Sequence, residues 1–264
     1  NSANLSFALC PLLTDGAIKA LLTAGSPEQQ QAFIPKMIEG AWTGTMNLTA
    51  PQAGSDLALV RTRAVPQADG TYKIFGTKIF ITYGEHDMAE NIVHLVLARV
   101  VGAPEGVKGI SLFICPKFMP DGSRNDVHCV SIEHKLGIKA SPTAVLQYGD
   151  HGGAVAELIG HENRGLETMF IMMNAARYAV GVQGIALAER AYQQAVAYAR
   201  DRVQSRPVDG SMHAAAPIIH HPDVKRMLLT MRACTEGCRA MALVAAAAYD
   251  ASHHHADAEL RQQN

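Results

Sequence analysis

The sequence shows no excess of charge of either sign. Its 264 residues include 23 Lys and Arg against 24 Asp and Glu, which leaves a formal net charge of −1. A balanced chain of this kind produces no positive field that would gather a polyanion or an anionic membrane surface. We therefore expect neither nucleic acid nor a membrane as a partner.

Cysteine pairs and nucleotide-binding loops are also missing. The five cysteines are odd in number and contain no Cys-x-x-Cys spacing, which favours free thiols in a reducing compartment over a disulfide framework. We expect a cytoplasmic protein. Because the sequence has no Gly-x-Gly-x-x-Gly motif and no P-loop, neither type of nucleotide site is indicated.

Long apolar runs are scarce. The longest lies around Met241–Tyr249 and is far shorter than the roughly 20 residues of a membrane-spanning helix, so no such helix is expected. The chain starts at Asn1 without a charged leader before an apolar run, and we expect neither a signal peptide nor a natural start there. We expect a piece of a longer protein.

Hydrophobic spacing predicts a helical beginning and a β-rich middle. Helical periodicity from Asp15 to Gly40, with a start signal at Ser26–Gln29, predicts two helices joined by a tight turn. Alternation with a period of two follows, interrupted by turn signals such as Asp69-Gly70. It predicts strands at 45–49, 72–82, 92–101, 110–115, 127–132, 144–148 and 155–159. Short strands at this spacing favour a barrel or a sandwich.

The last third is predicted to be helical. Glycine and proline are rare between Asn163 and Pro207, which predicts one helix of about 40 residues. A second long helix is expected after His221, to about Ala251 or beyond. The predicted fold class is α+β, with the end of an N-terminal helical domain at 1–41, a central β-barrel domain at 42–161 and the start of a C-terminal helical bundle at 162–264.

Two strand patterns that end in threonine are each followed by a turn that contains glycine. The first reads TMNLTAPQAGSD from Thr45, and the second reads GTKIFITYG from Gly76. Alternation places Thr45, Asn47 and Thr49 on one face of the first strand. Such a polar face suits a polar heterocycle, although a solvent-facing strand is the commoner explanation for one such segment alone.

The second pattern has an aromatic residue beside a hydroxyl. Alternation places Phe80 and Thr82 on one face of the strand, and Ile79 and Ile81 on the other. This pair suits an isoalloxazine ring, whereas core packing is the commoner role of one isolated phenylalanine. In the first loop, Gly54 would allow close approach of a ligand to the backbone; a plain turn is the alternative.

Together and in this order, the two segments resemble the flavin-facing segments of the acyl-CoA dehydrogenase family, which usually read Thr-Glu-Pro-x-x-Gly-Ser-Asp and Lys-x-aromatic-Ile-Thr. The resemblance extends from Gly40 to Met241. Two stretches, Gly84–Phe118 and Glu133–Ala144, are most similar to the subgroup that includes 3-methylmercaptopropionyl-CoA dehydrogenase. The implied fold is acyl-CoA dehydrogenase-like, with a helical N-terminal part, a central β-barrel and a truncated C-terminal helical bundle.

The resemblance implies an FAD enzyme of fatty acid metabolism. Such an enzyme dehydrogenates an acyl-CoA thioester between its α and β carbons and passes electrons to an electron-transfer flavoprotein or a similar acceptor. The residues it implies at the flavin ring are Leu48, Thr49, Phe80 and Thr82, and those at the CoA portion of the substrate are Gly54 and Ser55. Ala50 departs from the usual Glu of the loop, as do Met46 and Asn47 from the usual aromatic and small residues.

Charged residues on the long helix carry further expectations. Arg177 stands in an apolar stretch and is expected to be buried. It is either half of a structural ion pair or, as the resemblance implies, a substrate-binding residue that lies with Asn174 beneath the active site. Arg202 stands at the helix end, where a cation suits the helix dipole. The resemblance instead implies that Arg202 and Gln204 contact the FAD of a neighbouring subunit in a homodimer or homotetramer.

No residue of the chain is a convincing catalytic base, and the resemblance places the base beyond Asn264. An acyl-CoA oxidase would share these motifs, and a non-catalytic flavin-binding relative with a DNA-associated or structural role is a further alternative.

No metal site is expected, because consecutive residues such as His253–His255 point about 100° apart on a helix. Cys234 and Cys238 are expected to be core thiols, and Gly181 with Gly184 to allow close helix contact.

Overall fold

The computed structural model describes residues 1 and 3–263, apart from the side chains of residues 260, 262 and 263. Its contacts divide the chain into two compact units. The barrel unit comprises Leu5–Arg177, and the helical unit comprises Tyr178–Asn264 with Asn1–Asn4. The predicted domain limits at 41 and 161 follow changes of secondary structure, whereas the contact division falls inside a long helix.

Two helices open the barrel unit, α1 (Leu5–Ala24) and α2 (Pro27–Ile38). The start of α2 is as predicted, because Ser26 and Gln29 form a reciprocal capping box and proline occupies the first turn. The first helix begins at Leu5 rather than at Asp15. Its early turns were missed because a proline inside the helix, Pro11, weakens the helical signal.

Among the described residues, α1 alone is long and apolar enough, by length and composition, to cross a membrane. A search for uninterrupted apolar runs passes over α1 because Thr14, Asp15 and Lys19 interrupt its apolar residues, and the expectation that no helix spans a membrane stays a prediction. Core helices of soluble proteins pass the same test, and α1 packs as one. A Cβ atom added to Gly44 of the first strand would lie 2.5 Å from that of Ala17, so helix and strand are in close contact.

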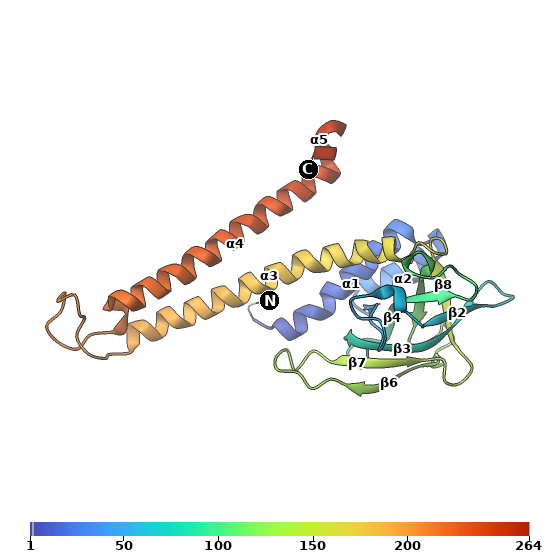
Figure 1. Cartoon of the computed structure of the whole chain (residues 1–264), viewed down its shortest axis with the longest axis horizontal. Coiled ribbons are helices and arrows are strands. Elements are labelled where there is room, and N and C mark those ends of the chain that lie inside the picture. Colours follow the sequence, from blue (N-terminus) through green and yellow to red (C-terminus); the bar gives the residue numbers. More distant parts are fainter. Residues whose placement is uncertain (2, 264) are drawn as a thin grey trace. The chain divides into compact units, whose positions relative to one another are not determined.

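Eight strands form the sheet of the barrel unit (Figure 1). They are β1 (Trp42–Asn47), β2 (Arg63–Pro66), β3 (Tyr72–Thr82), β4 (Asn91–Val100), β5 (Ile110–Pro116), β6 (Val127–Ile132), β7 (Thr143–Tyr148) and β8 (Ala154–Ile159). Short 3-10 turns lie at η1 (Leu57–Leu59) and η2 (Val107–Gly109). Six of the seven predicted strands end within one residue of the observed limits; β1 ends two residues before the predicted Thr49, and β2 was missed.

The strand pairing closes into a ring. Strand β4 pairs with β5, β5 with β8, β8 with β3, β3 with β2, and β2 again with β4. Strand β1 joins this ring through β4, while β7 and then β6 extend from β3. The expected central barrel is therefore confirmed. A core inside the ring includes Ile74, Val96 and Phe113, and a second core lies under α1 and α2.

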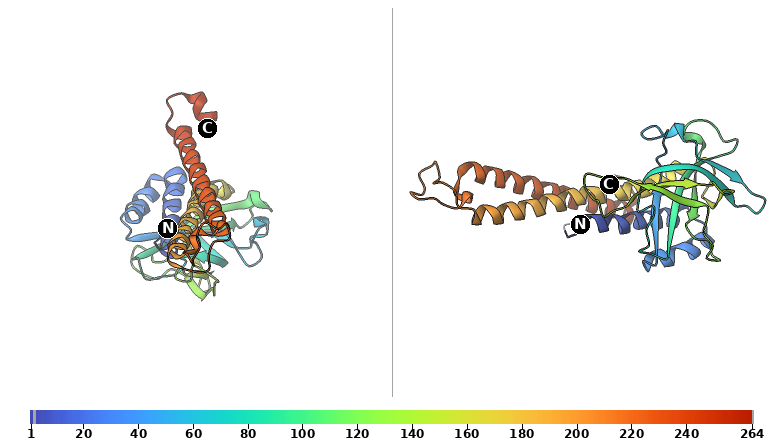
Figure 2. Two further views of the ribbon diagram at one scale, coloured as in Figure 1. Left: turned by 90° about the vertical axis from the view of Figure 1, so that its left-hand side faces the viewer. Right: turned by 90° about the horizontal axis from the view of Figure 1, so that it is seen from below.

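Long helices dominate the rest of the chain, as predicted. The long helices are α3 (Gly165–Asp201, 37 residues) and α4 (Pro222–His254, 33 residues), and the short elements are the 3-10 turn η3 (Ile218–His220) and α5 (Ala258–Gln263). From Tyr178 onward, α3 and α4 form a helical hairpin (Figure 2), in which α4 diverges from α3 with distance from the connecting loop (Figure 1). The hydroxyl of Tyr178 donates a hydrogen bond to the carbonyl of Ala242 (3.1 Å), and Arg239 pairs with Glu189 (2.8 Å).

Two expectations for the helical unit were wrong. Cys234 and Cys238 are exposed thiols rather than core residues. No described atom lies within 4 Å of a Cβ added to Gly181 or Gly184, so these glycines make no close helix contact within the chain. Periodicity identifies an apolar helix face, but it does not show what covers that face.

Candidate functional site

A pocket opens in the barrel unit where β1 and β3 end. It has a volume of about 150 Å³ and is partly open to solvent, which is smaller than the usual small-molecule site of about 300–1,000 Å³. Its lining consists of Leu13, Met46, Leu48, Thr49, Phe80, Ile81 and Thr82. The structure thus brings together the four residues that the sequence assigned to the flavin ring, from two segments more than 30 positions apart.

Two hydrogen bonds fix the spacing of these segments. The backbone N–H of Ile79 donates to the carbonyl of Thr49 (3.0 Å), and the ammonium of Lys78 donates to the carbonyl of Leu48 (2.8 Å). Lys78 is fully buried, and its burial lowers the pKa from 10.5 to about 7. Lys78 was not predicted as a site residue, although a lysine inside an apolar alternating run is itself an unusual signal.

A β-bulge shapes the pocket wall. The register of β3 against β7 shifts between Lys78 and Ile81, and Phe80 has a φ of 60°. The shift places Lys78 and Ile81 on the buried side and leaves Phe80 58% exposed. The bulge adds one residue to the alternation between Lys78 and Ile81, and Phe80 is not a core residue.

The exposed phenylalanine lies in strained backbone. A positive φ is unfavourable for a large aromatic residue, and such strain persists where the surrounding structure imposes it, often at ligand sites. Tyr83, three residues later, also has a positive φ, of 53°, and its hydroxyl donates to the carbonyl of Ser6 (2.7 Å). The bulge therefore presents an aromatic face to the pocket from a firmly held strand end.

Two hydroxyls on the pocket wall have no protein partner within the described part of the chain. Thr49 and Thr82 are both half-buried, and neither side chain makes a hydrogen bond there. Each can donate to and accept from a polar ligand. An aromatic side chain, two available hydroxyls and the apolar side chains of Met46 and Leu48 fit one edge of a flat polar heterocycle.

Thr45 and Asn47 do not belong to this wall. Thr45 Oγ1 lies 2.7 Å from Nδ1 of His94, and Asn47 donates to the same hydroxyl (2.9 Å) and accepts from Tyr148 (3.0 Å). Burial lowers the pKa of His94 to about 3, so this internal network is neutral at ordinary pH. The prediction that Thr49 shares their face was wrong, because β1 ends at Asn47.

The loop after β1 is short and mostly exposed. Ala50 and Ala53 are buried and exchange two backbone hydrogen bonds (2.9 and 3.1 Å), which folds the loop back on itself. Gly54 and Ser55 stand exposed beyond this turn. No atom lies within 4 Å of a Cβ added to Gly54, so a ligand has access to the backbone there. Ala50 supplies no charge where the family usually has a glutamate.

Arg177 and Asn174 are both exposed, contrary to the expected burial of the arginine. The guanidinium donates to the Asn174 side chain (2.8 Å) and lies 5.5 Å from the ring centre of Phe170. Neither polar residue lines the pocket. The apolar neighbours of Arg177 implied a covered helix face, but no described segment covers it.

Arg202 and Gln204 follow the end of α3 and are exposed. Their side chains contact each other at 3.4 Å. The backbone around them is held by hydrogen bonds from Gln204 N to the carbonyl of Ala216 (3.1 Å) and from Ile218 N to that of Arg202 (2.8 Å). This pairing fixes the loop after α3, and both side chains remain available to a partner.

Comparison with known proteins places these features in a family. Residues 45–151 match the acyl-CoA dehydrogenase middle domain, and residues 163–262 match the acyl-CoA dehydrogenase C-terminal domain. The sequence is 62% identical, over 96% of this chain and 44% of the relative, to 3-methylmercaptopropionyl-CoA dehydrogenase of Ruegeria pomeroyi. That similarity confirms the predicted subgroup resemblance.

Solved structures agree with the sequence matches. Butyryl-CoA dehydrogenase of Megasphaera elsdenii superposes with a TM-score of 0.77 at 25% identity, over 93% of this chain and 60% of that one. An acyl-CoA dehydrogenase of Bacillus anthracis complexed with FAD gives 0.70 at 27% identity, over 84% and 34%. The chain spans less than half the length of the curated relative from Ruegeria pomeroyi. On these matches and this fold, the chain belongs to the acyl-CoA dehydrogenase family.

Proposed function

We propose that the protein to which this chain belongs is an FAD-dependent acyl-CoA dehydrogenase that forms a double bond between the α and β carbons of an acyl-CoA thioester. The observation that carries the proposal is the pocket in which Phe80 stands beside the available hydroxyls of Thr49 and Thr82. Both pocket segments lie in the part of the chain that matches the family's middle domain. A solved relative of the same fold holds FAD.

The chain's own residues would bind and orient. Leu48, Thr49, Phe80 and Thr82 would hold the flavin ring, and the bound flavin would supply the hydride acceptor. Gly54 and Ser55 would contact the CoA portion through exposed backbone and a hydroxyl. A charge that develops on the thioester oxygen needs hydrogen-bond donors, and those donors would come from the pocket edge.

The proton-transfer group is proposed to lie outside this chain. Among the described residues, the pocket lining contains no carboxylate, and an acid beside Arg177 is missing because Asn174 and Ala176 stand there. We place the base beyond Asn264, in a helix that would also cover the exposed Arg177. An electron-transfer flavoprotein or a similar acceptor, a homodimer or homotetramer and a cytoplasmic location complete the proposal.

The test uses the intact parent protein. We expect it to purify yellow, and Thr82→Val to shift the flavin bands or to weaken FAD binding. Thr77→Val is the matched control, since Thr77 lies on the same strand and bonds Gln147 outside the pocket. A colourless wild-type protein that takes up no added FAD would contradict the proposal.

A second measurement separates the activities. Anaerobic addition of an acyl-CoA should bleach the flavin of the intact protein. Rapid reoxidation of the reduced flavin by oxygen would instead indicate an acyl-CoA oxidase. Bound FAD without any bleaching by acyl-CoA substrates would indicate a non-catalytic relative.

A further inference from the structure

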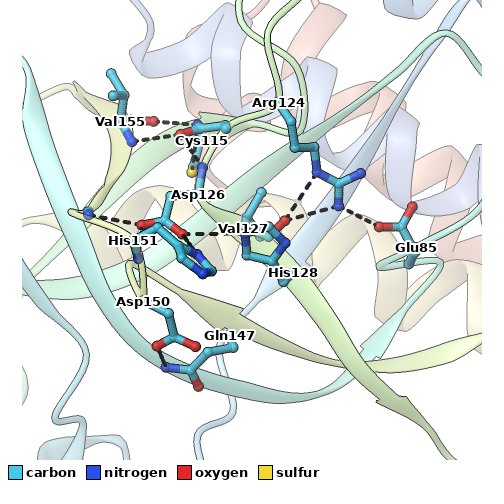
Figure 3. A network of polar contacts seen from close by, with 12 residues as sticks. Glu85, Cys115, Arg124, Asp126, Val127, His128, Gln147, Asp150, His151 and Val155 are labelled. Carbon is cyan, nitrogen blue, oxygen red and sulfur yellow. Dashed lines mark hydrogen bonds and ion pairs between the residues drawn. The ribbon is translucent and has the colours of Figure 1, made fainter.

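Three metal-ligating side chains meet at one end of the β6–β7 pair (Figure 3). Asp126 directly precedes β6, His128 lies in β6, and His151 lies in the turn between β7 and β8. One ligand atom from each lies within 4.8 Å of the other two. None of the three lines the pocket described above, so this cluster, the Asp126 cluster, is a separate feature of the barrel unit.

The carboxylate of Asp126 is held in a fixed orientation. Its Oδ2 atom accepts hydrogen bonds from the backbone N–H groups of His151 (2.8 Å) and Gly153 (3.0 Å). Its second oxygen, Oδ1, faces the two imidazole rings.

The backbone beneath the carboxylate is equally fixed. The buried side chain of Asn125 donates to the carbonyls of Pro116 and Val155 and accepts from the N–H of Val155, each at 2.9 Å. It ties the segment before β6 to β5 and β8. A metal ligand on such a framework loses little conformational freedom on binding.

Two distances in the cluster are close to those between the ligands of one metal ion, and the third pair of ligand atoms lies within 4.8 Å. Oδ1 lies 3.2 Å from Nδ1 of His151 and 3.4 Å from Nε2 of His128. Ligands about 2.0–2.1 Å from a tetrahedral zinc ion stand roughly 3.3–3.4 Å apart. The contact to His128 is longer than an ordinary N–H···O hydrogen bond, so hydrogen bonding alone explains one of the two contacts and not both.

We propose that Asp126, His128 and His151 form a binding site for a divalent transition-metal ion, of which Zn²⁺ fits best, with solvent completing the coordination. Two imidazoles and one carboxylate favour Zn²⁺ over Mg²⁺ and Ca²⁺, which prefer all-oxygen sites. The side chains of both histidines are open to solvent, at 41% and 75% exposure, so an ion can reach them. It would join the start of β6 to the β7–β8 turn.

The whole 264-residue chain, freed of metal by a chelator, is titrated with Zn²⁺ near neutral pH by equilibrium dialysis and calorimetry. The double variant His128→Ala/His151→Ala should bind one Zn²⁺ fewer per chain at the tight site, and Asp126→Asn should bind it at least 10- to 100-fold more weakly, the loss known for weaker perturbations of metal sites. Millimolar Mg²⁺ or Ca²⁺ should not compete.

The His253–His255 run is the obvious competing source of Zn²⁺ binding and supplies the control. Replacing all three by alanine should leave the tight site unchanged. If the double variant binds as many ions as the wild type with the same affinity, the Asp126 cluster is only a surface ion pair and the proposal is overturned. The same conclusion follows if the wild type binds no Zn²⁺.

Thermal unfolding provides a second test that does not depend on counting the bound ions. His128 and His151 are surface side chains, so the metal-free double variant should unfold near the wild-type midpoint. Zn²⁺ should raise the midpoint of the wild type and of the His253–His255 variant but not that of the double variant. An equal rise of the unfolding midpoint in all three proteins would show that Zn²⁺ binds outside the Asp126 cluster.

Discussion

The barrel unit and the helical unit differ in how many of their side chains they bury. Nine of the ten residues of β4 are buried, whereas Thr235 is the one residue described as buried on the 33-residue helix α4. Large apolar side chains such as Leu229, Leu243 and Val244 are mostly exposed there. A barrel closed by strand pairing contains its own core, but a helical hairpin cannot cover both of its faces.

Exposed apolar surface of this extent normally meets another segment or subunit. The chain matches only part of its relatives' length, and the family resemblance implies a complete bundle in an oligomer. The comparison therefore predicts that the barrel unit is stable through internal contacts, while the helical unit depends on contacts outside this chain. Each prediction below tests one side of that difference.

The largest effect on the free energy of unfolding is expected from a substitution that creates a cavity in the core of the barrel unit. Phe113 is completely buried within the ring core, and Phe113→Ala should lower the free energy of unfolding by about 3–5 kcal/mol. Leu243→Ala on α4, where the side chain is 66% exposed, should change it by less than about 0.5 kcal/mol in this chain. Urea unfolding of both variants measures the contrast, and similar costs would contradict it.

The next prediction tests whether the helical unit serves a cofactor. In the proposed oligomer of the intact protein, Arg202→Ala should weaken FAD binding by about 10- to 100-fold if the guanidinium contacts a phosphate, since hydrogen bonds to charged groups contribute about 1.5–3 kcal/mol. Arg200→Ala, in the last turn of the same helix, is the matched control. An unchanged FAD affinity in an intact oligomer would leave Arg202 only its interaction with the helix dipole.

The third prediction concerns the buried amine of the barrel unit. Lys78 has a pKa of about 7 in the fold against 10.5 normally, so between these values the unfolded chain binds more protons than the folded one. The free energy of unfolding should therefore rise with pH in that window, by about 1.4 kcal/mol per pH unit. This contribution is complete above pH 10.5 and is lost as the pH falls to about 7.

The measurement compares wild type with Lys78→Met by urea unfolding at about pH 7.5 and pH 9. The difference between the two proteins should change by about 2 kcal/mol over this interval. Subtracting the variant removes the contribution of all other titrating groups. A difference that does not vary with pH would show that Lys78 is solvated or charged in the fold.

Strand positions were predictable because local pattern decides them. Alternation bounded by turns located β3 and β6 without error. Strand β2 has four residues with one buried side chain, Ala64, which is too short to show a period. The bulge at Phe80 was not predictable, because no local rule of composition required a positive φ at an aromatic residue.

Only the part of the site that lies in local sequence motifs was predictable. Thr49 and Thr82 were identified because they end recognisable motifs, but Lys78 acts through a contact 30 residues away in sequence. The Asp126 cluster depends on a pairing between residues 25 positions apart and has no motif spacing. The expected burial of Arg177 was wrong because periodicity predicts an apolar helix face but does not show which segment covers that face.

The smallest effect should come from a helix cap in the barrel unit. The Ser26 hydroxyl accepts from Gln29 N (3.2 Å), and the Gln29 side chain accepts from Ser26 N (3.1 Å) while donating to the carbonyl of Leu158 in β8 (3.0 Å). The box thus links α2 to the barrel. The N-terminus of α4, at His221, has no side-chain cap bond, in keeping with the looser helical unit.

Ser26→Ala should therefore lower the free energy of unfolding by about 1 kcal/mol, the usual cost of a lost N-cap. Ser26→Thr keeps a hydroxyl at the same position and should recover most of that loss. Urea unfolding followed by the fluorescence of the single tryptophan, Trp42 of β1, reports on the barrel unit. If the alanine and threonine variants were equally stable, the hydroxyl would contribute nothing, and the link between α2 and β8 would depend on Gln29 alone.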